Sequence, residues 1–407
     1  MTPQKVTRLS VLFVNYNSWR LCVDAVRSLL EHRPRADRSE PLPLEVIVVD
    51  NCSPMRDPDA EADLRALLGS GECAGELVMH DENGGYSKGM NLGLARASGD
   101  AVLVCNPDIV FLEGCVDRLL DAVERDPTVG AAAPEGFWDA NCEGRLPPNI
   151  LPTMGDLLAL FAASLSPRMV RRYADRRTVD ALRIWQATAD VELPMLSGCC
   201  FVMLRSTIDR IGFFDERFPL YYEDTDLSMR MRRAGLRIVQ VFGARIVHLY
   251  NRSGQTNAAL AMERYYVSRR LYYRKWYGRL GTLVYDLLMK VQRTGWARRR
   301  ATLCPQRAIH ELGAYKGPPV IEFEREHAPF LVETALDPYF YLAAAMFGSG
   351  RRWTVGSKLF DSFGPATYYF RVLELAPTPR LIGVYRYTRI AWDAPDPVPE
   401  AQEVHHG

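Results

Sequence analysis

Short apolar runs alternate with helical segments through the first quarter of this 407-residue chain, and this alternation strongly limits the folds open to it. The runs with strand character lie at 9–15, 44–49, 76–80 and 101–105, with helical spacing between them, clearest at 19–30. Strands that alternate with helices form a sheet covered by helices on both faces. We therefore expect an α/β fold with a mostly parallel central sheet.

Two of the predicted strands are followed by aspartates, which places carboxylates at the edge where such sheets bind ligands. Asp50 follows the second strand, and Asp108 ends an Asn-Pro-Asp sequence after the fourth. Asp50 could accept a hydrogen bond from the imide N–H of uracil or thymine, or only cap its own turn. Asp108 could bind a divalent cation against a diphosphate, or belong to an Asx turn.

A glycine-rich segment at 83–93 precedes the fourth strand. Its glycines would let a ligand approach the backbone, and a helix that starts at Ser87 would offer free N–H groups to a phosphate. The alternative is a glycine-rich turn with Ser87 as the N-cap. The segment is neither a Walker A loop nor G-x-G-x-x-G, and the first strand lacks the fingerprint glycines of NAD-dependent oxidoreductases.

Three carboxylates fall within four positions at Glu223, Asp224 and Asp226, at the start of a predicted helix. Acids at a helix start suit the macrodipole, and this is the structural explanation. The macrodipole explanation, however, requires neither three acids nor the pair of tyrosines that precedes them. Clustered carboxylates raise one another's pKa, which suits a general base. His248 ends a later strand and gains a functional reading only if it lies near Asp108.

Composition narrows the classes of protein. The formal net charge of +1 gives no reason to expect a nucleic-acid binder. Nine cysteines without CxxC spacing indicate reduced thiols, and Cys199 and Cys200 fit small core residues. Neither a signal peptide nor an apolar run of the ~20 residues that a span requires is visible. We expect a cytoplasmic protein; its oligomeric state is not indicated.

Changes in residue pattern and composition along the chain predict several structural units. They are a catalytic-type α/β domain at 1–260 with an insertion or lid at 139–190, a helical extension at 261–316, a β-rich module at 317–392 and a disordered tail at 393–407. Regular turn signals favour a small β-sandwich for the third unit, and one strand at 366–372 resembles a fibronectin type III module.

Aromatic residues alternate with arginines through the helical segment 262–300. One interpretation is a helix that packs its aromatic face on the core and leaves its arginines in solvent. The other is an interfacial helix that contacts anionic lipid headgroups at the inner face of a membrane. The second interpretation would suit a lipid-linked substrate.

Taken in order, the motifs resemble glycosyltransferase family 2, and within it the rhamnosyltransferase-like branch. The resemblance covers roughly residues 8–280. The segments that carry it are 14–18, 49–53, 83–93, 106–108, 212–216, 222–227 and His248. It implies a GT-A nucleotide-binding fold and an inverting transfer of a sugar from a nucleotide-diphosphate donor to an acceptor hydroxyl.

The resemblance also implies roles for individual residues. Asp108 and His248 would hold Mg²⁺ or Mn²⁺ against the diphosphate, and Asp224 would be the general base. Asp50 would bind the nucleobase. The backbone around Val14 and Asn15, with Asn83 and Asn91, would line the donor pocket, to which Asn106 also belongs. Glu223 and Asp226 would orient the acceptor or cap the helix, and Gly198 would also lie on the acceptor side.

One residue departs from the pattern of many family members, which have an aspartate where Asn106 stands. A neutral amide is a weaker ligand for a hard cation. The favoured donor is dTDP-rhamnose, with a UDP-linked sugar as the alternative, and the favoured acceptor is a cell-surface glycan or a lipid-linked glycan.

Two other functions remain open. A non-catalytic carbohydrate-binding protein would explain Asn106 and the β module, although Asp108, Asp224 and His248 argue against it. A sugar nucleotidylyltransferase should carry a basic glycine-rich loop after the first strand, and residues 15–19 contain none.

Overall fold

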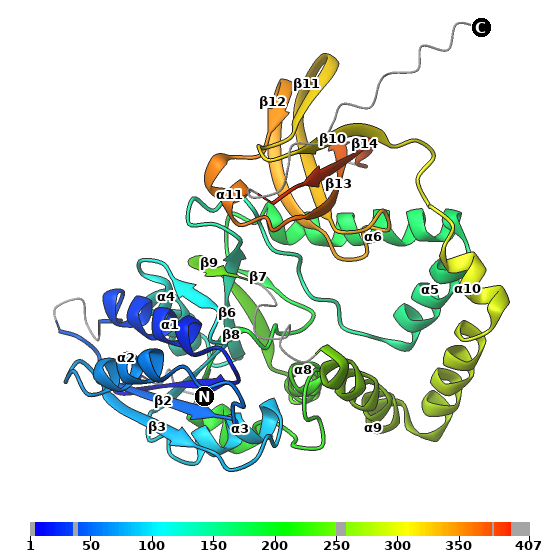
Figure 1. The fold of residues 1–407 in the computed structure, drawn as a ribbon. Coiled ribbons are helices and arrows are strands. Elements are labelled where there is room, and N and C mark those ends of the chain that lie inside the picture. The colour runs from blue at the N-terminus through cyan, green and yellow to red at the C-terminus, as the bar shows by residue number, and fades with distance from the viewer. Residues whose placement is uncertain (1–4, 36–39, 250–257, 377, 392–407) are drawn as a thin grey trace, which may run out of the picture.

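The computed structural model describes residues 5–35, 40–249, 258–376 and 378–391, and these fold around two β-sheets (Figure 1). The predicted disordered tail from residue 393 lies outside the described residues. The larger sheet runs in the order β3 (Ala74–Met79), β2 (Leu44–Asp50), β1 (Leu9–Asn15), β4 (Ala101–Cys105), β8 (Cys200–Leu204), β6 (Val129–Phe137), β9 (Arg237–His248) and β5 (Ile109–Phe111), with β7 (Val191–Glu192) paired to β9.

The α/β class is confirmed, but the large sheet is mixed rather than mostly parallel. Strands β3, β2, β1 and β4 pair in parallel, as the alternation predicted. Strand β8 then runs antiparallel to both β4 and β6, and β5 runs antiparallel to β9. The reason is that β8 follows the long insertion, so the simple strand–helix–strand crossover that enforces parallel pairing no longer applies.

Helices cover both faces of this sheet. One face packs against α1 (Trp19–Glu31), α2 (Pro58–Leu68) and α4 (Cys115–Arg125). The opposite face packs against α3 (Tyr86–Leu94), α7 (Arg205–Ile211) and α8 (Glu223–Arg233). Because both faces are buried, the parallel strands read as continuous apolar runs instead of alternating ones.

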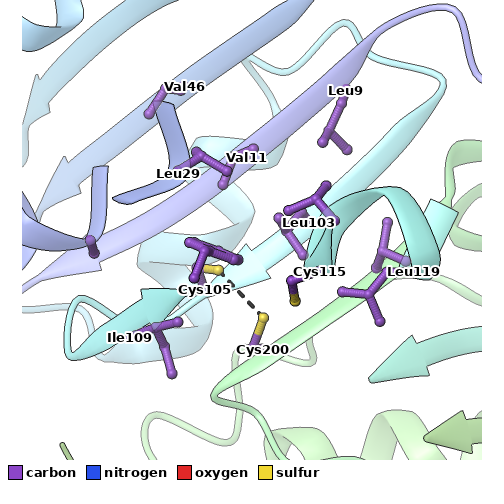
Figure 2. Close-up of a cluster of buried hydrophobic side chains, with 14 of the residues drawn as sticks. Leu9, Val11, Leu29, Val46, Leu103, Cys105, Ile109, Cys115, Leu119 and Cys200 are labelled. Atoms are coloured by element: carbon purple, nitrogen blue, oxygen red, sulfur yellow. Dashed lines mark hydrogen bonds between the residues drawn. The ribbon is translucent and has the colours of Figure 1, made fainter. Parts of the chain in front are cut away.

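Figure 2 shows part of the core on the first of these faces. Leu29 of α1 and Leu119 of α4 are fully buried there beside strand residues such as Leu103. Each such side chain contributes about 1.5–3 kcal/mol by leaving water. The sulfur atoms of Cys105 and Cys200 lie 3.7 Å apart without a disulfide, and all nine cysteines are free.

The insertion forms α5 (Met154–Leu165) and α6 (Pro167–Trp185), and its role as a lid stays a prediction. Ala181 and Trp185 of α6 pack against Leu331 and Leu373 of the smaller sheet. The apolar face of α6 is therefore occupied by that sheet, and of the described residues 139–190 only Asn149 lines the cavity described below.

The C-terminal module is one sheet, so the predicted β-sandwich and its fibronectin type III likeness are wrong. Its order is β10 (His310–Tyr315), β14 (Arg380–Arg389), β13 (Ala366–Glu374), β11 (Val320–Ala335) and β12 (Ala344–Thr354). The face away from α6 packs on α11 (Ser357–Asp361), with Leu359 and Phe360 beside Phe370. Turn spacing predicts strands, but it does not say whether they share a sheet.

A long helix, α9 (Ala258–Gln292), leads to α10 (Gly295–Ala301) and borders the molecule on one side (Figure 1). Gly278 has a φ of 67° and divides α9 into two limbs. Tyr272, Tyr273 and Tyr285 are buried in one cluster, so the aromatic side packs on the rest of the protein. In the described parts of the chain, no helix has the length and apolar character needed to cross a membrane.

Candidate active site

A cavity of about 470 Å³ opens at the carboxyl ends of β1 and β4. The beginnings of α8 and α9 form part of its wall. Of the twelve residues predicted as a site, eight line it: Val14, Asn83, Asn106, Asp108, Gly198, Glu223, Asp224 and His248. The other four, which do not line it, are Asn15, Asp50, Asn91 and Asp226.

Asp108 and His248 lie together at one end of the cavity. This proximity was the condition for a functional interpretation of His248. They are brought together by antiparallel pairing of β5 with β9, in which Ile109 lies opposite His248. Nε2 of His248 lies 3.3 Å from Oδ1 of Asp108, and both residues are buried. Burial lowers the pKa of His248, but Cys199 and Asp108 favour the imidazolium and raise the pKa to about 10.

Glu223 and Asp224 form the acidic wall of the cavity at the first turn of α8. Oδ2 of Asp224 accepts a hydrogen bond from the backbone N–H of Gly198 at 3.0 Å, which fixes the carboxylate. Oε2 of Glu223 is buried and accepts no hydrogen bond from any described residue. Burial raises the pKa of Glu223 well above its usual value, and the neighbouring Asp224 charge raises it further. Burial also raises the pKa of Asp224, against the hydrogen bonds that it accepts.

The backbone that leads into this wall is strained. Tyr221 and Tyr222 have φ values of 62° and 66°, in the left-handed region that large side chains rarely adopt. The ring of Tyr222 is held by Tyr265 and Tyr272 of α9, with centroids 5.7 and 5.3 Å away. Strain of about 1–3 kcal/mol per residue persists only where packing enforces it, and it gathers at functional sites.

Asp226 has a different role from the predicted acceptor contact. It is fully buried on the far side of the α8 turn. Its carboxylate forms ion pairs with Arg230 at 3.0 Å and Lys275 at 2.7 Å, and it accepts a hydrogen bond from Trp276 at 2.9 Å. Residues two apart on a helix point about 200° apart, so Asp224 and Asp226 cannot share a wall. Asp226 instead anchors α9 to α8.

Asp50 is buried and does not line the cavity, contrary to the predicted nucleobase contact. Its carboxylate accepts hydrogen bonds from Asn15 Nδ2 at 2.8 Å and from the Ser53 hydroxyl and backbone N–H at 2.5 and 3.1 Å. The turn-capping alternative is therefore the one that the structure has. The side-chain N–H of Asn15 donates to Asp50, and its side-chain oxygen accepts a hydrogen bond from the backbone N–H of Ser18. The Asn15 side chain is therefore occupied outside the cavity.

The glycine-rich segment also differs from expectation. Helix α3 is preceded by Gly85 as the N-cap, not Ser87, whose hydroxyl donates to the carbonyl of Phe218 at 2.5 Å. A Cβ at Gly85 would lie 2.3 Å from the carbonyl oxygen of Pro219, so the glycine permits chain packing. Asn91 donates to the carbonyl of Phe214 at 2.9 Å, outside the cavity.

Three residues that line the cavity were not predicted as site residues from the sequence, although Asn51 lies in one of the segments that carry the family resemblance. Arg264 of α9 reaches across from 181 positions away and donates to the side chain and backbone of Asn83 at 3.0 and 3.1 Å. Asn51 donates to the same amide at 3.1 Å, while its own buried Oδ1 accepts no hydrogen bond from the described chain. Cys199, predicted as a core residue, is only partly buried and lies at the wall.

The family model for Glycosyl transferase family 2 matches residues 10–212, about half of the chain. The chain belongs to this family.

Among curated relatives, an N-acetylglucosaminyl-diphospho-decaprenol L-rhamnosyltransferase of Mycobacterium tuberculosis is 29% identical over 222 residues, 51% of this chain and 66% of the relative. This chain thus spans just under two thirds of that relative. The low-salt glycan biosynthesis hexosyltransferase of Haloferax volcanii is 24% identical over 57% of this chain and 64% of its own. The family assignment, with its rhamnosyltransferase-like branch, agrees with the sequence prediction.

Solved structures of similar proteins include GalNAc-T7 with UDP, GalNAc and Mn²⁺, at a TM-score of 0.43 and 15% identity over 60% of this chain and 43% of its own. A mannosyltransferase from Pyrobaculum calidifontis with GDP-Man and Mn²⁺ gives a TM-score of 0.42 and 16% identity, over 74% of this chain and 85% of its own. These scores are too low to support an argument. The GT-A assignment therefore rests on the family and on the α/β sheet itself.

The end of the cavity at Asp108 and His248 suits a divalent cation only in part. Among the described residues, no three His, Cys, Asp or Glu side chains form a group that could hold a metal. Asp108 and His248 would nevertheless offer two ligand atoms once a cation displaces the proton of the His248 imidazolium, whose Nε2 lies 3.3 Å from the buried Oδ1 of Asp108. Two protein ligands are enough where substrate phosphates and water complete the coordination, as they do for Mg²⁺.

Proposed function

We propose that the protein is an inverting glycosyltransferase that moves a sugar from a nucleotide-diphosphate donor to an acceptor hydroxyl. The observation that carries this proposal is the distribution of charge in the cavity. A pair that could hold a cation, Asp108 and His248, lines the same space as the buried carboxylate of Glu223 and the half-buried carboxylate of Asp224. The first pair fits a diphosphate leaving group, and the second fits removal of a proton.

At the donor end, Asp108 and His248 would hold Mg²⁺ or Mn²⁺. When bound, the ion would neutralise the diphosphate and stabilise it as a leaving group. Arg264 adds a guanidinium at the same cavity, already oriented by its two bonds to Asn83. A guanidinium binds phosphate oxygens through two parallel N–H donors, so Arg264 would contact the donor diphosphate or a phosphate of the acceptor.

At the acceptor end, Asp224 would be the general base. Its carboxylate would take the proton of the acceptor hydroxyl as that oxygen forms a bond to the anomeric carbon. The bond from this carbon to the diphosphate oxygen breaks on the opposite face, so the configuration inverts. Glu223 is the more deeply buried of the two, and its Oε2 accepts no hydrogen bond from the described residues, so Glu223 would keep a proton and donate a hydrogen bond to the acceptor.

We assign the nucleobase contact to a different residue from the one predicted. Asn51 presents a buried carbonyl oxygen without a hydrogen-bond partner among the described residues, and it lines the cavity beside Tyr16. An amide carbonyl can accept the imide N–H of uracil or thymine, and a buried acceptor gains most when such a donor arrives. Asp50 would position this turn from below through its bonds to Ser53.

We favour dTDP-rhamnose as the donor, with a UDP-linked sugar as the alternative. This choice rests on the similarity to a rhamnosyltransferase, whose name also specifies a glycan carried on a polyprenyl diphosphate. By the same similarity, we favour a lipid-linked glycan as the acceptor. A cytoplasmic location remains a prediction.

The non-catalytic alternative has one observation in its favour, which is the neutral Asn106 at the cavity beside a two-residue metal pair. Calorimetric titration with UDP, dTDP and GDP, each with and without Mn²⁺, separates the two functions. We expect one diphosphate series to bind, with an affinity that falls by more than about tenfold without the metal. His248→Ala should abolish the metal effect, whereas His310→Ala, on the exposed β10, should not. Failure of every diphosphate to bind would reject the transferase.

A further inference from the structure

The second limb of α9 presents an apolar stripe to solvent. Leu280, Leu283 and Leu287 have 72%, 65% and 58% of their surfaces exposed. Their spacing of three and four residues places them on one side of a helix. A helix of a globular protein normally turns such a stripe toward the core, and contiguous exposed leucines indicate an interaction surface.

The core-facing side of the same limb is already occupied by other residues. Thr282, Tyr285 and Leu288 are buried there, and Tyr285 stacks on Tyr273 of the first limb. The C-terminal end of α9 reaches α5 through a hydrogen bond from Gln292 to Ser164 at 3.2 Å. The exposed leucines are therefore an additional face, and Figure 1 shows this limb and α10 at the outer edge of the protein.

The stripe lies in a strongly basic setting. Residues 274–307 contain nine lysines and arginines and a single acid, Asp286. That acid is paired with Arg270 at 2.8 Å, so it offsets little of the surrounding charge. Just beyond the stripe, Trp296 is 56% exposed, and its ring lies under the guanidinium of Arg300 at 5.7 Å. Arg298 and Arg299 are exposed as well.

We propose that this surface, made of Leu280, Leu283, Leu287 and Trp296 with the arginines of α10, docks on an anionic lipid bilayer. Leucines and a tryptophan enter the headgroup boundary while lysines and arginines contact anionic headgroups. Charge complementarity favours this occupant over a second copy of the chain. Two copies that met at this face would bring two sets of like charges together, whereas a bilayer supplies the opposite charge.

The docking surface and the cavity share one helix. The first limb of α9 supplies Leu260, Ala261 and Arg264 to the cavity wall, and the second limb carries the stripe. A protein docked through the second limb would hold the cavity near the headgroup layer. This consequence rests on the proposed function, since only a lipid-linked acceptor would require the cavity to lie there.

Sedimentation with vesicles tests the docking surface directly. The wild-type chain is mixed with vesicles of phosphatidylcholine alone, or with a minor share of phosphatidylglycerol. We expect binding to the anionic vesicles, weakened by salt, and at least about tenfold weaker for the triple variant Leu280→Ser/Leu283→Ser/Leu287→Ser. A control with Leu336→Ser/Leu381→Ser, two leucines that are 67% and 56% exposed in the C-terminal module, should bind like the wild type.

Two outcomes would overturn the proposal. One is an equal affinity of the wild type and the triple variant for anionic vesicles. The other is a wild-type dimer in light scattering that the triple variant dissociates, which would make this face a contact between copies. The charge-reversal variant Arg298→Glu/Arg299→Glu/Arg300→Glu tests, independently of the leucines, whether the arginines of α10 contribute to binding of anionic vesicles. The nucleotide titration above is run on the same samples, so loss of donor binding and loss of vesicle binding are separate results.

Discussion

Two of the regions in which this protein buries carboxylates surround them in opposite ways. At the contact between α6 and the C-terminal sheet, Glu333 is 2% exposed and pairs with Arg371 at 2.5 Å, with Thr178 donating to it at 2.7 Å. At the cavity, Glu223 is 6% exposed, and among the described residues neither it nor Asp224 forms an ion pair with lysine or arginine.

The contrast separates a structural use of charge from a chemical one. A buried carboxylate costs several kcal/mol in lost hydration, and a cation with good geometry offsets that cost. Glu333 has such a cation. The cavity carboxylates lack one, so burial raises their pKa values, which prepares them to hold and exchange protons. The same residue type therefore holds two units together in one place and, under the proposed function, transfers a proton in the other.

The largest expected effect tests the chemical side of this contrast. Asp224→Asn removes the proposed base but keeps the side chain's shape, so the transfer rate should fall by about 10²–10⁴-fold. Nucleotide binding and thermal unfolding should change little. Asp209→Asn, on α7 outside the cavity, is the matched control. Turnover is measured with saturating donor, and undiminished transfer by the variant would remove Asp224 from the base role.

The structural side predicts a loss of stability instead. Arg371→Met leaves Glu333 buried without its cation, and the free energy of unfolding should fall by about 3–5 kcal/mol. The double variant Glu333→Gln/Arg371→Met removes both charges and should recover part of that loss. Denaturant unfolding gives both values, and calorimetry should find the donor affinity unchanged in folded samples. If Arg371→Met left stability intact but abolished transfer, the assignment of the two regions would be reversed.

A smaller effect concerns stability against pH. Because the folded state raises the pKa of Glu223, the unfolded chain releases this proton at a lower pH than the folded chain does. Stability therefore falls as the pH rises above the unfolded value near ~4.3, and the loss grows until the folded pKa is reached. Glu223→Gln cannot ionise, so its melting temperature should exceed that of the wild type at neutral pH and approach it under acid conditions. A gap that widened toward acid pH would contradict the burial argument.

Local patterns predicted the elements well. The first and fourth strands were expected at 9–15 and 101–105, and they occur at Leu9–Asn15 and Ala101–Cys105. These strands are buried on both faces, so their apolar runs have sharp ends. The direction of β8 and the single C-terminal sheet were not predictable in the same way, because strand pairing depends on contacts between distant segments.

The candidate site was predicted only in part, because it too depends on contacts between distant segments. Residues whose role depends on their position at a strand or helix end, such as Asp108 and Asp224, do line the cavity. Asp226 was predicted on the acceptor side, and only the packing of α9 shows that it is buried away from the cavity. Arg264 lies in a helix with many arginines, and nothing local marks it as the one that reaches Asn83.

The anchoring of α9 by Asp226 bears on where the protein can be cut. The family match ends at residue 212, which invites a shortened form for expression. Any fragment that stops before Tyr265 would bury the Asp226 carboxylate without Lys275 and without the indole N–H of Trp276. It would also release the rings that hold Tyr222 in its strained conformation. The smallest autonomous folding unit is thus longer than the stretch by which its kinship is recognised.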